Sequence, residues 1–301
     1  MFKKIKILSI SIAIIILSSF SSSELSIAPT YDSNYVMASS ITHNNEKYVV
    51  IYLKRKDKRV RAKYFAFKLD GKSVYNRYKE WAENKDKICY TSGTYMDGSY
   101  DANTANLVGI TIDNGKVVNK TVESTRMDGL VIVYPHGGIA VSDLREGNLK
   151  LSGGGANTSH NYDIRNNTDK ERFIDWAKSQ RATVFQTHLL AYRNELSVGK
   201  YNSNTSNKRE RRFLAIGKDP SGQVIHCIVH KPESSNLYDA GTKVLEYLQT
   251  RKRMEVIALL NLDTGAQDVF GLYTKSGNKN SIAQGQTELS NARNLLVYYF
   301  E

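Results

Sequence analysis

The sequence predicts an α+β protein whose core is a mixed, hairpin-rich β-sheet with a few packed helices. Short apolar runs of the kind that form strands recur along most of the 301 residues. Several runs are joined by Asp-Gly or Asn-Gly, pairs that supply the positive φ angles of two-residue hairpin turns. Only two segments have the spacing of an amphipathic helix. Composition shifts too little to divide residues 45–301, so we expect one domain there.

The first residues have the pattern of a secretory signal. A basic start at residues 1–6 is followed by an apolar run over about 7–20 and then by serines. That run is short for a bilayer, which takes about 20 residues to cross. We therefore expect residues 1–23 to be a signal peptide, and the protein to be secreted or placed in the cell envelope, without spanning the membrane once the signal is removed. The alternative is a buried N-terminal helix, which the three lysines disfavour.

The next segment, residues 24–44, is rich in serine and is expected to be a tether or an edge segment. Strand-like runs and turns then follow one another. In order they are a strand at 49–53, a strand at 64–69 turning at 70–71, a strand at 107–112 turning at 114–115 into 116–118, a strand at 130–134 turning at 135–138 into 139–141, and a strand at 214–217 turning at 219–222 into 224–229.

Two helices are expected in the second half. Thr168 and Glu171 form a capping box, in which each side chain satisfies a free backbone amide of the other. The helix that follows carries Phe173, Ile174, Trp176 and Ala177 on one side. A second helix is expected from about Thr242 to Arg251. Its apolar face consists of Val244, Leu245, Tyr247 and Leu248.

The apolar run at 256–260 follows this second helix directly. A continuous apolar run of that length is typical of a strand buried on both faces. The order of strand, helix and buried strand therefore predicts a crossover unit.

The charge of the chain is strongly basic. The formal charge is +12 and falls to +9 when the lysines at 3, 4 and 6 leave with the signal. Such a charge favours anionic surroundings, for example cell-wall polymers, phosphorylated glycans or nucleic acid. The basic residues lie in short runs, which are also typical of solvated loops. No aromatic platform accompanies them, so nucleic acid is not expected as a partner.

The cysteine and histidine spacings are weak signals. Cys89 and Cys227 are compatible with one disulfide in an oxidising compartment or with two buried thiols, and both remain open. His226 and His230 would point to the same face of a strand. No CxxC or HExxH motif occurs.

Asp263 is the strongest candidate for a catalytic or metal-binding residue. It follows a buried strand and precedes Gly265, a position where sheets often present polar side chains to a cleft. An aspartate there can act as general base or acid, or can bind a divalent cation such as calcium or magnesium. The alternative is an aspartate that only caps the turn.

Several segments between about residues 48 and 272 follow one another in a recognisable order, namely 90–95 with the hairpin 109–116, 184–190, 213–217 with the turn 219–222, and 261–265. This order resembles that of the phosphodiester glycosidases. The resemblance implies a secreted, glycosidase-like hydrolase acting on a sugar phosphodiester or on another cell-surface glycan.

Site residues follow from the same resemblance. Asp263 would be the acid/base or metal-holding group, and Arg212 and His188 would hold the phosphate, which needs a cation because its charge persists at ordinary pH. The backbone amides of Thr91, Ser92 and Gly93 would line the pocket. The remaining expected substrate-binding residues are Gln186, Thr187, Asn261 and Gly265.

The chain departs from the family pattern at several of these positions. In this chain Thr91 replaces the family's asparagine, Ser92 its first glycine and His188 its Gly-Pro pair. Phe213 occupies the place of the family's arginine, with Arg212 adjacent, and residues 264–268 replace the closing Gly-Gly-Ser. These departures keep open an alternative, a catalytically silent relative that binds an anionic glycan or a partner protein at the cell surface.

Overall fold

The computed structural model describes residues 24–26, 34–67, 69–97, 106–123, 127–147, 149, 162–198, 208–274 and 277–301. The expected signal peptide, residues 1–23, lies outside them. Within this part of the chain the helices are α1 (Val74–Ala82), α2 (Asn167–Ser179) and α3 (Leu237–Thr250), with 3₁₀ turns η1 (Lys56–Lys58), η2 (Leu144–Glu146) and η4 (Leu289–Asn291). The strands are β1 (Glu24–Ser26), β2 (Val36–His43), β3 (Glu46–Lys54), β4 (Val60–Ala66), β5 (Asp86–Thr91), β6 (Thr111–Asp113), β7 (Lys116–Asn119), β8 (Gly129–Val133), β9 (Ile139–Asp143), β10 (Thr183–Tyr192), β11 (Glu195–Leu196), β12 (Arg209–Lys218), β13 (Val224–Ser235), β14 (Glu255–Leu262), β15 (Val269–Tyr273), β16 (Lys279–Gln284) and β17 (Asn294–Phe300).

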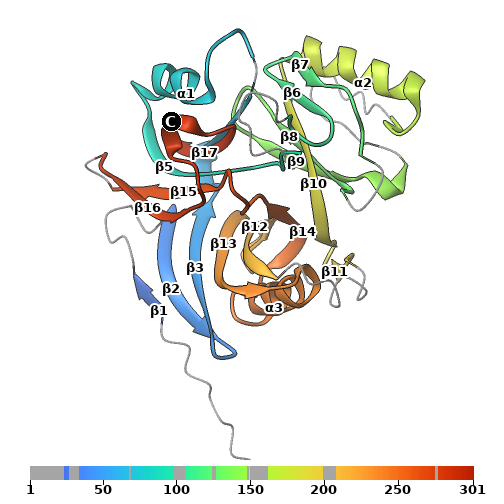
Figure 1. Ribbon diagram of the computed structural model, residues 1–301. Coiled ribbons are helices and arrows are strands. Elements are labelled where there is room, and N and C mark those ends of the chain that lie inside the picture. Colours follow the sequence, from blue (N-terminus) through green and yellow to red (C-terminus); the bar gives the residue numbers. More distant parts are fainter. Residues whose placement is uncertain are drawn as a thin grey trace, which may run out of the picture.

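The fold is α+β and mostly β, with two antiparallel sheets (Figure 1). The larger sheet has the order β1-β2-β3-β13-β12-β14-β10-β6-β7, with β8, β9 and β11 attached beside β10, and the smaller has the order β16-β15-β5-β17-β4. The expectation of a mixed sheet is wrong for the described strands, because all their ladders are antiparallel.

The predicted crossover is present and explains that error. Strands β13 and β14 are joined by α3 and both pair antiparallel with β12, so they run parallel to each other. Because β12 lies between them, the crossover creates no parallel ladder. The run at 256–260 is the central strand β14, buried from both sides as expected.

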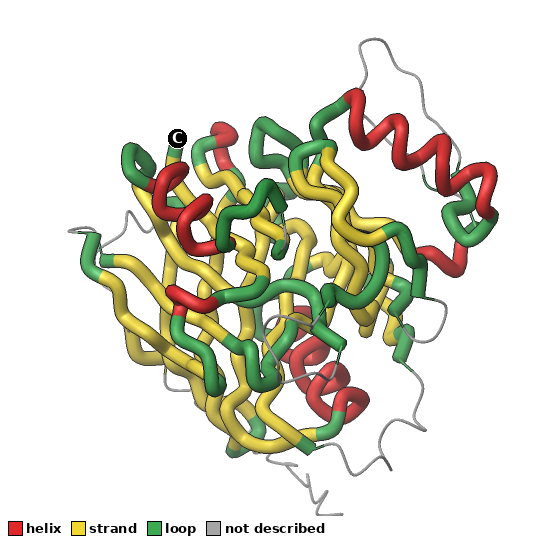
Figure 2. Tube along the Cα trace, turned by 45° about the horizontal axis from the view of Figure 1, so that its top comes forward, coloured by secondary structure: helices red, strands yellow, loops and turns green. Residues whose placement is uncertain are grey.

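The core is layered. One apolar layer lies between the two sheets, with residues from β12 and β14 on one side and from β4, β5, β15 and β17 on the other. A second layer packs the other face of the large sheet against α3, a third packs β6, β8 and β10 against α2, and a fourth packs the outer face of the small sheet against α1. The helices therefore cover three separate surfaces of the sheets (Figures 1 and 2).

The hairpin predictions are confirmed at three turns. Strands β6 and β7 meet at Asn114 and Gly115, whose φ angles are 49° and 80°. The ladders β8–β9 and β12–β13 also pair as expected. At Asp70-Gly71 the turn is present, but it leads into α1, which the sequence reading missed; Ser73 caps that helix by accepting a hydrogen bond from the Asn76 amide.

Helix α3 has the predicted apolar face but begins earlier than expected. It starts at Leu237 because the side chain of Asn236 caps it, accepting from the Asp239 amide at 2.8 Å. Gly241 lies in the added turn, where a Cβ would be only 3.3 Å from the Leu190 Cδ1, so the missing side chain lets α3 pack closely on β10.

The predicted apolar face of α2 is confirmed, but its cap is not Thr168. The side chain of Asn166 accepts from the amides of Thr168 and Asp169, so the helix begins two residues earlier than the capping box suggested. Asn166→Ala should therefore lower the free energy of unfolding by about 1 kcal/mol, the usual effect of losing an N-cap. Thr168→Ala is the control and should change it by less than half as much in urea titrations; the reverse ranking would contradict the assignment.

The two cysteines are free. Cys89 lies in the layer between the sheets and Cys227 lies in the layer beneath α3, so the sheet separates their thiols. The disulfide alternative is thus wrong, and burial raises the pKa of both thiols.

His226 and His230 are buried on one face of β13, where His226 contacts the Tyr298 hydroxyl and His230 contacts Arg212. In the described residues, no group of three His, Cys, Asp or Glu side chains is arranged to hold a metal ion. No helix in the described part of the chain has the length and apolar character needed to cross a membrane.

Candidate functional site

Asp263 lies immediately after β14, with its side chain only 5% exposed. Its amide donates to the Gly93 carbonyl at 3.0 Å, and its carboxylate accepts from the Gly265 amide at 2.9 Å. Burial raises the pKa of this carboxyl to about 6, against the Gly265 hydrogen bond, which lowers it. Asp263 therefore caps its turn, and its carboxyl group also titrates close to neutral pH.

Asn261 and Tyr95 bring unpartnered polar groups to the same end of β14. Asn261 is fully buried, and neither its amide nitrogen nor its amide oxygen has a hydrogen-bond partner among the described residues. The Tyr95 hydroxyl is also buried and has no hydrogen-bond partner among the described residues. It interacts electrostatically with Asp263, Arg211 and Arg209. Buried polar groups are rarely left unpaired in proteins, so this cluster is suited to a polar ligand.

His188 joins this cluster. It lies directly opposite Asn261 in the β10–β14 ladder, so the two side chains share a face of the sheet. Its ring packs edge-on against Tyr95 with centroids 5.1 Å apart. The structure therefore brings together three sequence-predicted residues, Asp263, Asn261 and His188, and adds Tyr95.

Arg212 does not face this cluster. Successive residues of a strand point to opposite faces, and Arg212 points into the layer between the sheets. There it is fully buried and donates to both carboxylate oxygens of Asp268, at 2.5 and 2.9 Å, with its guanidinium 4.3 Å from the Phe270 ring. The prediction that Arg212 holds a phosphate is therefore not supported by its position, because its charge is already paired with a carboxylate.

Thr91, Ser92 and Gly93 likewise form hydrogen bonds within the protein. The Thr91 hydroxyl accepts from Arg212 at 3.3 Å, the Ser92 amide donates to the Val269 carbonyl, and the Gly93 amide donates to the Asn294 side chain at 2.6 Å. The expectation that the Ser92 and Gly93 amides line a pocket is thus wrong.

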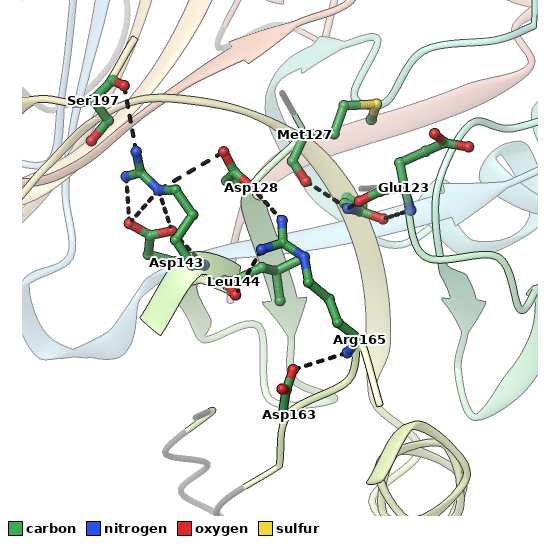
Figure 3. A network of polar contacts seen from close by, with 10 residues as sticks. Glu123, Met127, Asp128, Asp143, Leu144, Asp163, Arg165 and Ser197 are labelled. Carbon is green, nitrogen blue, oxygen red and sulfur yellow. Dashed lines mark hydrogen bonds and ion pairs between the residues drawn. The ribbon is translucent and has the colours of Figure 1, made fainter. Parts of the chain in front are cut away.

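Gln186 and Thr187 hold neighbouring segments in place. The Gln186 side-chain nitrogen donates to the carbonyls of Glu123 and Met127, at 2.7 and 2.5 Å, and its oxygen accepts from the amides of Glu123 and Ile110. Figure 3 shows Glu123 and Met127 with the hydrogen bonds that they make here, and the ion pair of Arg165 with Asp128 beside them. The Thr187 hydroxyl donates to the Asn261 carbonyl, so these two residues position the site and are not free to bind a substrate.

The sequence reading missed Tyr95, Arg209 and Arg211. Tyr95 closes the segment at 90–95 that carried the resemblance, and the two arginines lie in the basic run at 208–212. Arg209 is exposed and its charge lowers the pKa of Asp263, opposing burial. The Arg211 Nε donates to the Ser235 carbonyl at 3.0 Å. Alternation along β12 could have shown that 209 and 211 share the face opposite to Arg212.

Comparison with protein-family models finds no match, and no curated protein is similar at the level of sequence. Among the solved structures, 13 chains match in fold, and they include the following three. The catalytic domain of zebrafish N-acetylglucosamine-1-phosphodiester alpha-N-acetylglucosaminidase, auto-inhibited by its pro-peptide, is 14% identical over 92% of this chain and 88% of that one, with a TM-score of 0.49. A hypothetical protein from Synechocystis is 7% identical over 89% and 62% (TM-score 0.45), and a Burkholderia pseudomallei protein provisionally named as exported is 7% identical over 88% and 74% (TM-score 0.40).

Proposed function

We propose that the chain is an exported, phosphodiester-glycosidase-like hydrolase that cleaves a sugar phosphodiester or a related bond in a cell-surface glycan. The observation that carries the proposal is the cluster at the end of β14. A buried carboxyl, Asp263, lies there with the unpartnered amide of Asn261 and the unpartnered hydroxyl of Tyr95. The order of motifs along the sequence supports the same class of reaction.

Asp263 has the properties of a general base in this reaction. In a sugar phosphodiester the bond between the anomeric carbon and the phosphate oxygen breaks, and its electron pair stays with the phosphate. A water molecule forms the new bond to the anomeric carbon and gives a proton to the Asp263 carboxylate. Because the pKa of Asp263 is about 6, the carboxylate is available at neutral pH and still basic enough to accept the proton.

Arg209 and Arg211 replace Arg212 as the cations for the phosphate in this proposal. Both act electrostatically on the Tyr95 hydroxyl, and Arg209 also acts on Asp263, although less strongly than the paired Arg212 does. Positive charge at that position stabilises the negative charge that develops on the leaving phosphate. No step is assigned to calcium or magnesium, since among the described residues Asp263 belongs to no group of three His, Cys, Asp or Glu side chains that could hold a metal ion.

The test is turnover of an N-acetylglucosamine-1-phosphodiester compared with a neutral aryl glycoside of the same sugar. We expect release of free sugar from the phosphodiester. Arg209→Gln should lower kcat/KM for the phosphodiester about tenfold, as expected for one lost hydrogen bond to a charged group, and should spare the neutral glycoside. Arg172→Gln, an exposed arginine on α2, is the matched control and should change neither. Equal losses on both substrates would contradict the role given to Arg209.

The silent-relative alternative has a specific observation in its favour, namely that Arg212 and the amides of Ser92 and Gly93 are all engaged within the protein. It predicts binding of the phosphodiester without release of sugar. Binding of that kind, unchanged in Asp263→Asn, would replace the hydrolase proposal.

A further inference from the structure

A second candidate binding site lies on the outer face of the small sheet, beneath α1. Two hollows of about 720 and 400 Å³ are bounded by α1, β15, β16 and η4. They have Tyr75, Lys279 and Leu289 in common, so together they form one elongated groove. Their volumes fall in the range of small-molecule sites, roughly 300–1,000 Å³.

Four tyrosines line this groove, three of them buried and Tyr75 partly exposed. Tyr75 and Tyr78 have ring centroids 6.4 Å apart, the hydroxyls of Tyr78 and Tyr273 are hydrogen-bonded, and the rings of Tyr273 and Tyr90 are 5.7 Å apart. The buried rings therefore support Tyr75, whose flat apolar face and hydrogen-bonding tip suit the faces and hydroxyls of sugars.

Gly271 keeps the Tyr90 ring in place. A Cβ at this position would lie 2.3 Å from the Tyr90 hydroxyl, so only a glycine lets that ring cross β15 there. The sheet itself therefore fixes the position of the Tyr90 ring at this end of the groove.

The charges around the groove are balanced, which decides the class of ligand. The lining includes three lysines and three glutamates, namely Lys79, Lys87, Lys279, Glu80, Glu83 and Glu288. Glu80 is bound by Lys72, and the Lys87 amine donates to the Ala82 carbonyl at 3.2 Å while lying 5.7 Å from the centre of the Tyr273 ring. A groove with equal numbers of both charges does not select a polyanion, although the whole chain is basic. It offers both donors and acceptors to a neutral polyhydroxylated molecule.

We infer that this groove binds a neutral oligosaccharide, which would run across Tyr75 from one hollow to the other. It is distinct from the cluster at Asp263. Tyr90 and Val269 belong to the outer layer of the small sheet, whereas their chain neighbours Thr91 and Asp268 contact Arg212 on the inner side. The inference therefore does not depend on the proposed hydrolase activity.

The test is calorimetric titration of the full chain with N-acetylchitohexaose, cellohexaose and maltohexaose, and with hexagalacturonate as the charged comparison. At least one neutral hexasaccharide should bind, with an affinity that changes little between low and high salt, since no ion pair is involved. Tyr75→Ala should weaken binding about tenfold or more, and Tyr75→Phe should keep most of it. The matched control is Tyr238→Ala, because Tyr238 is also the second residue of a helix and partly exposed; it should bind as the wild type does.

Three results with the wild-type protein and Tyr75→Ala would each overturn the inference. They are failure of all the neutral probes to bind, wild-type affinity in Tyr75→Ala, or binding of hexagalacturonate alone. Asp263→Asn separates the two sites. Retention of hexasaccharide binding in that variant supports a separate groove, whereas its loss would place the sugar in the Asp263 cluster and contradict the inference.

Discussion

Asp263→Asn is expected to abolish most turnover and, above pH 6, to make the protein more stable. The loss of turnover follows from the role of the carboxylate as general base, a role that contributes about 10²–10⁴-fold to rate. For the wild-type protein, kcat/KM should rise with pH through about 6, where Asp263 ionises. The variant should lack that limb in its residual rate.

The gain in stability follows from burial of the same carboxyl. Its pKa is raised from 3.8 to about 6 in the folded state, so the folded chain holds the proton more tightly than the unfolded chain does. Stability therefore falls as pH rises from about 4 through 6, and above that range the buried charge destabilises the fold by on the order of 3 kcal/mol. Asparagine cannot ionise, so urea titrations should show a gain of roughly 2 kcal/mol at pH 8 and little change at pH 4.

Asp219→Asn is the matched control. Asp219 also caps a turn from its carboxylate, accepting from the Ser221 amide at 2.9 Å, but it is partly exposed in the β12–β13 turn. Its replacement should neither change turnover nor stabilise the protein at pH 8. Full turnover in Asp263→Asn would exclude the base role. Loss of turnover together with loss of stability at pH 8 would indicate that Asp263 is only structural.

The elements of the fold that could be predicted were those with local signals. Asn114-Gly115 specified a hairpin because only a few residues adopt two successive positive φ angles. The apolar run of β14 indicated a strand buried on both faces. The antiparallel pairing of the large sheet could not be predicted in this way. The position of β12 between β13 and β14 depends on tertiary contacts, which have no local signal in the sequence of either strand.

The site was predicted in part for the same reason. Asp263 was found because the end of a buried strand is a recurrent location for function, and Asn261 and His188 were found because their segments resemble those of the phosphodiester glycosidases. Arg212 was misplaced because a shift of one residue along β12 moves a side chain to the other face of the sheet. The role of Gln186 was predicted wrongly because its side chain, buried in β10, donates to the carbonyls of Glu123 and Met127, a contact that depends on the tertiary fold.

Breaking the pair of Arg212 and Asp268 by removing one partner should lower stability more than breaking any exposed ion pair described. Both side chains are fully buried, and the arginine makes two hydrogen bonds to the carboxylate. Removing one member leaves an uncompensated charge in the core, so Asp268→Ala should lower the free energy of unfolding by about 3–5 kcal/mol. Guanidinium titration at pH 7 measures this directly, and Lys116→Ala, which breaks the exposed pair with Asp70, should change it by less than about 1 kcal/mol.

A double variant shows whether the Arg212–Asp268 pair only stabilises the fold or also takes part in binding the phosphate. Arg212→Met with Asp268→Leu removes both charges and fills similar volume, so it should recover most of the stability lost in Asp268→Ala. If the pair only supports the fold, this double variant should also retain turnover of the phosphodiester, because the phosphate is assigned to Arg209 and Arg211 on the other face. If the double variant is stable but inactive on the phosphodiester while still cleaving the neutral glycoside, Arg212 is the phosphate-binding cation after all, and the ion pair with Asp268 must open when substrate enters.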